Sequence, residues 1–197
     1  MTQKYENKIL TIPNVLSVFR ICLIPIFIWL YSVKQNYIWA GYVLVLSGIT
    51  DIMDGFIARK FHLISNLGKI LDPIADKLTQ GVILLCLISR FSFMIVPFIL
   101  LILKEIFAGV TGLLVIRKTG QVFGADWHGK VSTCLLYAMM IIHVVWYNIS
   151  PVFSNIFIIV CIAMMIVSFV LYGIRNIRAL TNPKLYDNDI KESSKNG

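Results

Sequence analysis

The chain has 197 residues, of which 58% are hydrophobic and only 14% are charged, and its mean hydropathy is +0.81. This composition excludes an ordinary soluble domain and a disordered chain, and it indicates a membrane protein. No aromatic and basic groove motif accompanies the net charge of +8. We therefore expect membrane lipids as partners, with the positive charge attracted to anionic headgroups, and no nucleic acid.

Residues 1–13 mix Lys4 and Lys8 with apolar side chains, which predicts a short interfacial helix lying on the membrane. This segment lacks the small-residue cleavage site of a signal peptide, so we expect it to remain in the mature protein. Pro13 and Asn14 predict its end.

Spanning a bilayer takes about 20 apolar residues, and six segments approach that length. They are Val15–Val33, Tyr37–Arg59, Ile70–Ser89, Phe91–Ile116, Val131–Tyr147 and Val152–Ile174. The predicted fold class is all-α, a polytopic membrane bundle of six transmembrane helices. We expect one domain over residues 14–175 and a polar cytoplasmic tail over residues 176–197.

Basic residues lie mainly at one set of segment ends. The opposite loops contain only Lys34 and Arg90, whereas the 60–69 and 117–130 connections are rich in Lys and Arg. The positive-inside rule then places both termini and these two connections in the cytoplasm. Because no transit peptide is recognisable, we expect a multi-pass protein of a bacterial plasma membrane.

Four of the ten acidic residues fall within 26 positions. The stretch has the pattern Asp51-x2-Asp54-Gly55-x2-Ala58-Arg59-x8-Gly68-x3-Asp72-x3-Asp76. At about 100° per residue, the acidic and small residues of each half share one helical face. Two helices meeting there would bring four carboxylates together at the cytoplasmic side.

Clustered carboxylates repel each other in a low dielectric, which favours one or two bound divalent cations. Oxygen ligands favour Mg²⁺, Mn²⁺ or Ca²⁺ over Zn²⁺. The structural alternative pairs the carboxylates with Lys60, Lys69 and Lys77. The functional interpretation is favoured because ionisable residues in membrane helices usually serve a function.

This pattern resembles the signature of the CDP-alcohol phosphotransferase family. Ile12-Pro13-Asn14-x2-Ser17-x2-Arg20 resembles the entry to the first helix in its phospholipid-synthase branch. The resemblance implies a six-helix homodimer in which an alcohol attacks the β-phosphorus of a CDP-linked lipid, CDP-diacylglycerol, and CMP leaves. It also implies two divalent cations per site, Mg²⁺ or Mn²⁺.

The resemblance implies a role for each position of the pattern. Asp51, Asp54 and Asp72 would be metal ligands, and Asp76 would lie at the metals and act as the general base. The residues expected to bind the CDP-lipid donor are Asn14, Ser17, Arg20, Asp54, Gly55, Ala58, Arg59 and Gly68. For Asn14 and Ser17, helix capping is an equal alternative.

Lys104, Arg117 and Lys130 are the candidates for binding the acceptor. A partner carboxylate is the alternative for Lys104, and lipid headgroups are the alternative for the other two. Gly129-Lys130-x2-Thr133 resembles the fifth helix of the phosphatidylglycerophosphate synthase and cardiolipin synthase branches. We expect the neighbouring His128 to be solvated.

The acceptor expected first is glycerol 3-phosphate. Three departures from that branch bring phosphatidylglycerol closer as an alternative. Lys104 stands in place of Arg, Gly112 or a neighbour in place of a second Arg, and Ser132 in place of a second Lys. The hypothesis from another class is a cation transporter that uses intramembrane aspartates.

Overall fold

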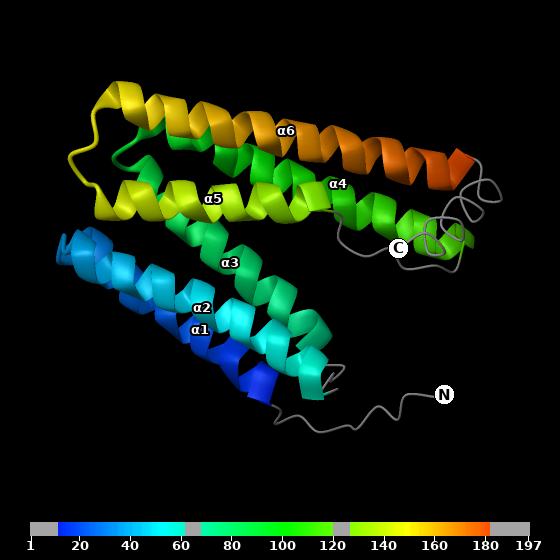
Figure 1. Cartoon of the computed structure of the whole chain (residues 1–197), viewed down its shortest axis with the longest axis horizontal. Helices are drawn as coiled ribbons and strands as arrows, with labels where there is room; N and C mark the ends of the chain where they lie inside the picture. The colour runs from blue at the N-terminus through cyan, green and yellow to red at the C-terminus, as the bar shows by residue number, and fades with distance from the viewer. Residues whose placement is uncertain (1–11, 62–67, 120–126, 182–197) are drawn as a thin grey trace. The chain divides into compact units, whose positions relative to one another are not determined.

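The computed structural model describes residues 12–61, 68–119 and 127–181, and these ranges contain helices and short turns but no strand. At residues 12–13, 54–61, 69–70 and 119 it describes the backbone alone. The prediction of an all-α fold is confirmed. The α-helices are α1 (Ile12–Ile28), α2 (Tyr37–Phe61), α3 (Gly68–Ile88), α4 (Ile95–Thr119), α5 (Trp127–Val145) and α6 (Pro151–Thr181) (Figure 1).

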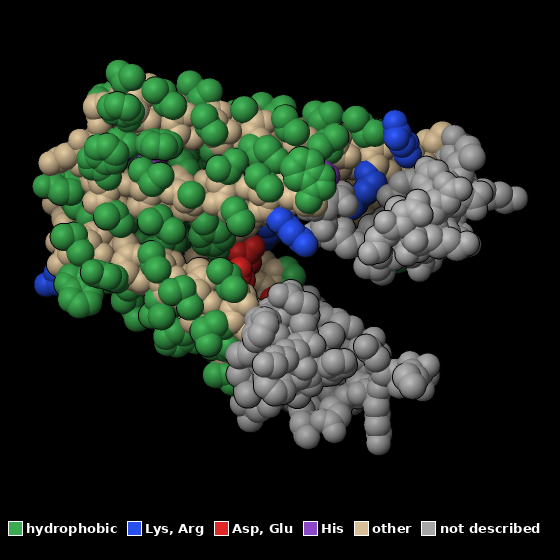
Figure 2. Space-filling view, viewed as in Figure 1, with side chains coloured by type: hydrophobic (Ala, Val, Ile, Leu, Met, Phe, Trp, Pro, Cys, Tyr) green, Lys and Arg blue, Asp and Glu red, His purple; other side chains and the backbone are tan. Residues whose placement is uncertain are grey.

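The helices have the length and the surface of membrane helices. Hydrophobic side chains cover most of the visible face of the described helices (Figure 2). Among the described residues, α2 has a shorter apolar stretch, Tyr37–Met53. Four segments are long and apolar enough to cross a bilayer: Asn14–Val33, Ser92–Lys118, Trp127–Val145 and Pro151–Thr181. The protein is therefore a membrane protein, and six crossings remain a prediction.

Several helix ends differ from those expected, among them the starts of α1 and α5 and the end of α6. Helix α1 begins at Ile12, because Pro13 fits a first turn, where its missing N–H breaks no hydrogen bond. Helix α5 begins at Trp127, four residues before the expected start. Helix α6 continues to Thr181, so the polar tail expected over residues 176–197 is helical at its beginning.

The cause of the longer α6 is visible in its burial. Asn176 and Ala179 are buried, so the packed face of α6 continues past the last apolar run. The predicted interfacial helix, apart from its last two residues, and the rest of the tail lie outside the described residues. The same holds for residues 62–67 and 120–126 of the two predicted cytoplasmic connections.

The chain divides into two compact units, residues 1–95 with 137–156 and residues 96–136 with 157–197. In the first unit, α1 packs against both α2 and α3 (Figure 1). In the second unit, α4 packs along α6, where the rings of Phe107 and Phe169 lie 4.9 Å apart. The single domain over residues 14–175 remains a prediction.

Aromatic residues hold the helix ends of the first unit that lie far from the acidic residues. The guanidinium carbon of Arg90, just after α3, lies 5.1 Å from the ring centre of Tyr37 and 5.5 Å from that of Tyr147. The two tyrosine rings stack on each other at 5.4 Å. Cation–π contacts of this kind stabilise the arrangement, so the ends of α2, α3 and α5 are joined there.

Helix α2 also approaches α5 closely at a glycine, which gives a test of this packing. A methyl group added at Gly41 would lie 2.6 Å from Cγ2 of Val145, whose branched side chain is restricted in a helix. We expect Gly41→Ala to lower the thermal unfolding midpoint, because overpacking costs about 1–3 kcal/mol.

Gly48→Ala in the same helix is the matched control. Among the described residues, no atom lies within 4 Å of the added methyl group, and alanine favours a helix over glycine by about 1 kcal/mol. We expect this variant to unfold at or above the wild-type midpoint in the same detergent. Equal midpoints for the two variants would contradict the close approach.

Candidate active site

Helix α1 turns a polar face into the first unit. Asn14, Ser17 and Arg20 recur every three residues, and their exposed fractions are only 4%, 0% and 0%. Residues at this spacing share one side of a helix. The capping alternative for Asn14 and Ser17 was wrong, because both lie inside α1 rather than before its first turn. A buried arginine in a membrane helix needs an anion nearby.

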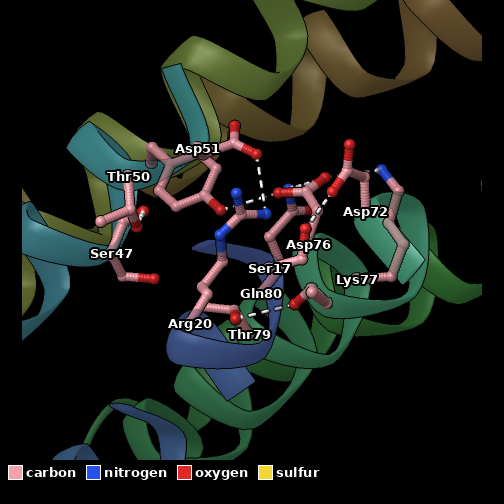
Figure 3. Close-up of polar contacts among 12 residues, drawn as sticks. Ser17, Arg20, Ser47, Thr50, Asp51, Asp72, Asp76, Lys77, Thr79 and Gln80 are labelled. Atoms are coloured by element: carbon pink, nitrogen blue, oxygen red, sulfur yellow. Dashed lines mark hydrogen bonds and ion pairs between the residues drawn. The ribbon is translucent and has the colours of Figure 1, made fainter. Parts of the chain in front are cut away.

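The polar face of α1 binds carboxylates of two other helices (Figure 3). Nη1 of Arg20 lies 2.7 Å from Oδ1 of Asp51 in α2. The hydroxyl of Ser17 donates a hydrogen bond to Oδ1 of Asp72 in α3. Arg20 is fully buried, whereas 38% of the Asp51 side chain is exposed. The guanidinium group in α1 is therefore shielded from solvent, whereas a ligand can reach the carboxylate of Asp51.

Asp76 follows Asp72 by one turn of α3 (Figure 3). Three side chains contact it. Nε2 of Gln80 lies 2.9 Å from Oδ1 and 3.0 Å from Oδ2 of Asp76. The Tyr137 hydroxyl of α5 donates to Oδ1 at 2.8 Å. Nζ of Lys77 is 3.6 Å from Oδ2. Lys77 is one of the three lysines considered as partners of the carboxylates, and it does lie beside one of them.

The sequence interpretation missed Gln80 and Tyr137. Gln80 continues the spacing of four from Asp72 and Asp76, so it stands on the same face of α3, and this signal was available. Tyr137 is separated from Asp76 by 61 positions. No spacing rule connects residues of two helices so far apart, so Tyr137 had no sequence signal.

The three described carboxylates of the signature, Asp51, Asp72 and Asp76, form one electrostatic cluster, since the charges of Asp72 and Asp76 both act on Asp51. Carboxylate and hydroxyl oxygens are the ligands that a hard divalent cation prefers, so the donor chemistry fits such an ion. In the part of the chain that the structure describes, no three His, Cys, Asp or Glu side chains converge on one ion position. The side chain of the remaining predicted ligand, Asp54, is outside that part.

For most of the other predicted donor-binding residues the structure describes the backbone and not the side chain. Gly68 is buried at the first position of α3. Gly55, Ala58 and Arg59 follow Asp54 on the last turns of α2, where the structure describes the backbone alone. Their roles remain predictions.

The predicted acceptor residues belong to the second unit. Lys104 is 8% exposed in the middle of α4, whereas Arg117 and Lys130 are exposed at helix ends. The expectation of a solvated His128 was wrong. This residue is the second of α5 and is 5% exposed, with Nδ1 3.3 Å from Oγ of Ser168. The earlier start of α5 explains the difference.

The sequence of the chain matches the profile of the CDP-alcohol phosphatidyltransferase family over residues 10–171. This range includes α1 to α5, most of α6 and every acidic residue of the cluster. The chain belongs to this family. Members of the family act on CDP-diacylglycerol and an alcohol acceptor and generally depend on a divalent metal.

The chain is similar to two kinds of bacterial enzyme. The CDP-diacylglycerol–glycerol-3-phosphate 3-phosphatidyltransferase of Bacillus subtilis is 34% identical over 137 residues, which cover 62% of this chain and 70% of the relative. The Rickettsia typhi enzyme of the same name is 36% identical over 96 residues, 48% of this chain and 54% of the relative. The cardiolipin synthase (CMP-forming) of Streptomyces coelicolor is 44% identical over 82 residues, 39% of this chain and 38% of the relative.

The chain thus spans only 38% and 54% of the length of the Streptomyces and Rickettsia proteins. Membership of the family is secure over the matched range.

The buried pair of Arg20 and Asp51 predicts a stability effect. Arg20→Met keeps an apolar stem but leaves Asp51 without its guanidinium partner, and breaking a buried pair costs about 3–5 kcal/mol. The partial exposure of Asp51 reduces this figure, so we expect a clear decrease of the thermal unfolding midpoint in detergent.

Arg178→Met is the matched control, because Arg178 is exposed near the end of α6. We expect this variant to unfold near the wild-type midpoint. An Arg20→Met protein as stable as the control would show that the pair does not hold α1 to α2.

Proposed function

We propose that the protein transfers the phosphatidyl group of CDP-diacylglycerol to glycerol 3-phosphate and releases CMP. The acceptor hydroxyl oxygen would form a bond to the phosphorus that carries diacylglycerol. The bond from that phosphorus to the CMP oxygen would break, and the hydroxyl proton would move to Asp76. The products would be phosphatidylglycerophosphate and CMP.

The observation that carries this proposal is the cluster formed by Asp51, Asp72 and Asp76 within the family signature. Ser17 and Arg20 of α1 bind two of these carboxylates, so helices α2 and α3 present their acidic faces to one place. Phosphoryl transfer depends mainly on positioning and charge neutralisation, which suits such a cluster. A cation transporter would not need a match over the whole signature.

In this proposal, Asp51, Asp54 and Asp72 hold two divalent cations, Mg²⁺ or Mn²⁺, with Asp76 beside them. Bound cations would neutralise charge on the attacking and leaving oxygens of the donor and acceptor. The chain's own contribution is to fix the carboxylates, through Arg20 on Asp51 and Ser17 on Asp72.

The remaining predicted residues divide between the two substrates. We assign donor binding to the polar face of α1 and to the small and basic residues of the signature, and acceptor binding to basic residues of α4 and α5. The donor set is Asn14, Ser17, Arg20, Asp54, Gly55, Ala58, Arg59 and Gly68, and the acceptor set is Lys104, Arg117 and Lys130.

Glycerol 3-phosphate is favoured because the relatives that align over more of this chain carry that acceptor in their names. Phosphatidylglycerol is the second candidate, because a cardiolipin synthase shares 44% identity over a shorter range. The distribution of basic residues supports a bacterial plasma membrane with both termini and the cluster on the cytoplasmic side. The homodimer remains a prediction.

CMP release by the purified protein with Mg²⁺ and CDP-diacylglycerol tests the proposal. We expect release with glycerol 3-phosphate, and Asp76→Asn should lower it by about 10²- to 10⁴-fold, the usual contribution of a general base. Release with phosphatidylglycerol alone would make the protein a cardiolipin synthase. Absence of release with both acceptors would refute the proposed reaction.

The cation assignment has a separate readout. Asp72→Asn keeps the hydrogen bond from Ser17 possible but removes one negative charge, so we expect a higher Mg²⁺ concentration at half-maximal activity. Glu105→Gln, which removes a charge from α4, should leave that concentration within about twofold, since Glu105 lies outside the signature. An unchanged Mg²⁺ dependence in Asp72→Asn would contradict the assignment.

A further inference from the structure

The hydrogen bonds around Asp76 distinguish its two carboxylate oxygens. An ionised carboxylate has about four acceptor positions, two on each oxygen. Oδ1 accepts from Nε2 of Gln80 at 2.9 Å and from the Tyr137 hydroxyl at 2.8 Å. Its two positions are therefore filled. Oδ2 accepts from Gln80 at 3.0 Å.

Lys77 does not fill the last position on Oδ2. Its Nζ is 3.6 Å from that oxygen, which is longer than an ordinary hydrogen bond of about 2.7–3.2 Å. Among the described residues, no donor fills the second acceptor position of Oδ2, and a substrate hydroxyl can point toward it. The surroundings of Asp76 thus assign different tasks to the two oxygens.

The groups that occupy Oδ1 are well suited to fix the carboxylate plane. The terminal torsion of an aspartate is broad and has no sharp minimum, so the side chain alone does not select which oxygen faces a substrate. Gln80 is 1% exposed and contacts both oxygens, and Tyr137 approaches from a different helix. Contacts from two directions restrict rotation about that torsion.

The orientation of Gln80 follows from the chemistry of its partner. An ionised carboxylate only accepts hydrogen bonds, so the amide nitrogen of Gln80 must face Asp76 and the amide oxygen must face away. Among the described residues, that amide oxygen is buried without a hydrogen-bond partner. Leaving a buried acceptor unsatisfied costs about 1–3 kcal/mol. The hydrogen bonds from the amide nitrogen to Asp76 offset this cost and hold the side chain in this orientation.

We propose that Gln80 and Tyr137 are positioning residues that hold Oδ1 of Asp76 and present Oδ2 to the acceptor hydroxyl. This inference rests on the proposed function, in which Asp76 takes the proton of that hydroxyl. The proton moves to Oδ2, the hydroxyl oxygen bonds to phosphorus, and the bond to CMP breaks with its electron pair on the CMP oxygen. Neither Gln80 nor Tyr137 exchanges a proton in this step.

The test compares Tyr137→Phe and Gln80→Met with the wild-type protein in the CMP-release assay. Each variant keeps the size of the side chain and removes the donor to Asp76. We expect kcat to fall about tenfold or more, because a misaligned base loses part of its effect. KM for CDP-diacylglycerol and for the acceptor should stay within about twofold, since in this proposal the two residues act on Asp76 and not on the substrates.

Tyr42→Phe is the matched control, because Tyr42 lies in α2 and is 62% exposed. It should leave kcat and both KM values unchanged. The double variant Tyr137→Phe with Gln80→Met should lose less kcat than the product of the two single losses, because both residues act through one carboxylate. Fully multiplicative losses would indicate separate roles and overturn the proposal.

Two other results would also overturn it. A raised KM with an unchanged kcat would make the residues substrate-binding groups, and an unchanged kcat in both single variants would remove any positioning role. A wild-type protein that releases no CMP with either acceptor would refute the proposed function and this inference with it.

Thermal unfolding checks the contact itself without turnover. The midpoint shift caused by Tyr137→Phe should be present in the wild-type background and smaller in an Asp76→Ala background. Equal shifts in both backgrounds would show that Tyr137 does not act through Asp76, and would overturn the inference even if the enzyme is active.

Discussion

The organisation of the candidate site depends on one buried cation in α1. Arg20 is fully buried in an apolar helix, and its charge is compatible with that position because Asp51 lies 2.7 Å away. The same face of α1 carries Ser17, which holds Asp72. The packing of α1 on α2 and α3 and the assembly of the acidic cluster are therefore parts of one interaction. Gln80 and Tyr137 hold the remaining described carboxylate of the cluster, Asp76.

Much of this arrangement could be predicted from spacing within single helices. The intervals of three and four residues place Asp51 with Asp54, and Asp72 with Asp76, on common faces. The requirement of Arg20 for an anion was also predictable from its place in an apolar segment. The identity of that anion was not, because the register of α1 against α2 is set by packing between helices. Tyr137 was missed for the same reason.

The helix ends show a different limit. Polar residues near the end of an apolar run resemble a boundary, so the sequence predicts helix ends at Val131 and Ile174. The two helices in fact begin at Trp127 and end at Thr181. Burial against a neighbouring helix decides whether such a polar residue continues the helix. His128 and Asn176 are buried in this way, at 5% and 3% exposed. Local composition does not contain that information.

The polar face of α1 affects how the first two helices enter the membrane during translation. Translation delivers α1 to the membrane before α2, so Arg20 enters the bilayer ahead of Asp51. An unpaired arginine in a membrane helix costs up to about 2.5–3.5 kcal/mol, the figure for a helix centre. The hairpin of α1 and α2 is then the smallest unit in which this charge is balanced. Release of the nascent chain into lipid is therefore favoured for the two helices together, rather than for α1 alone.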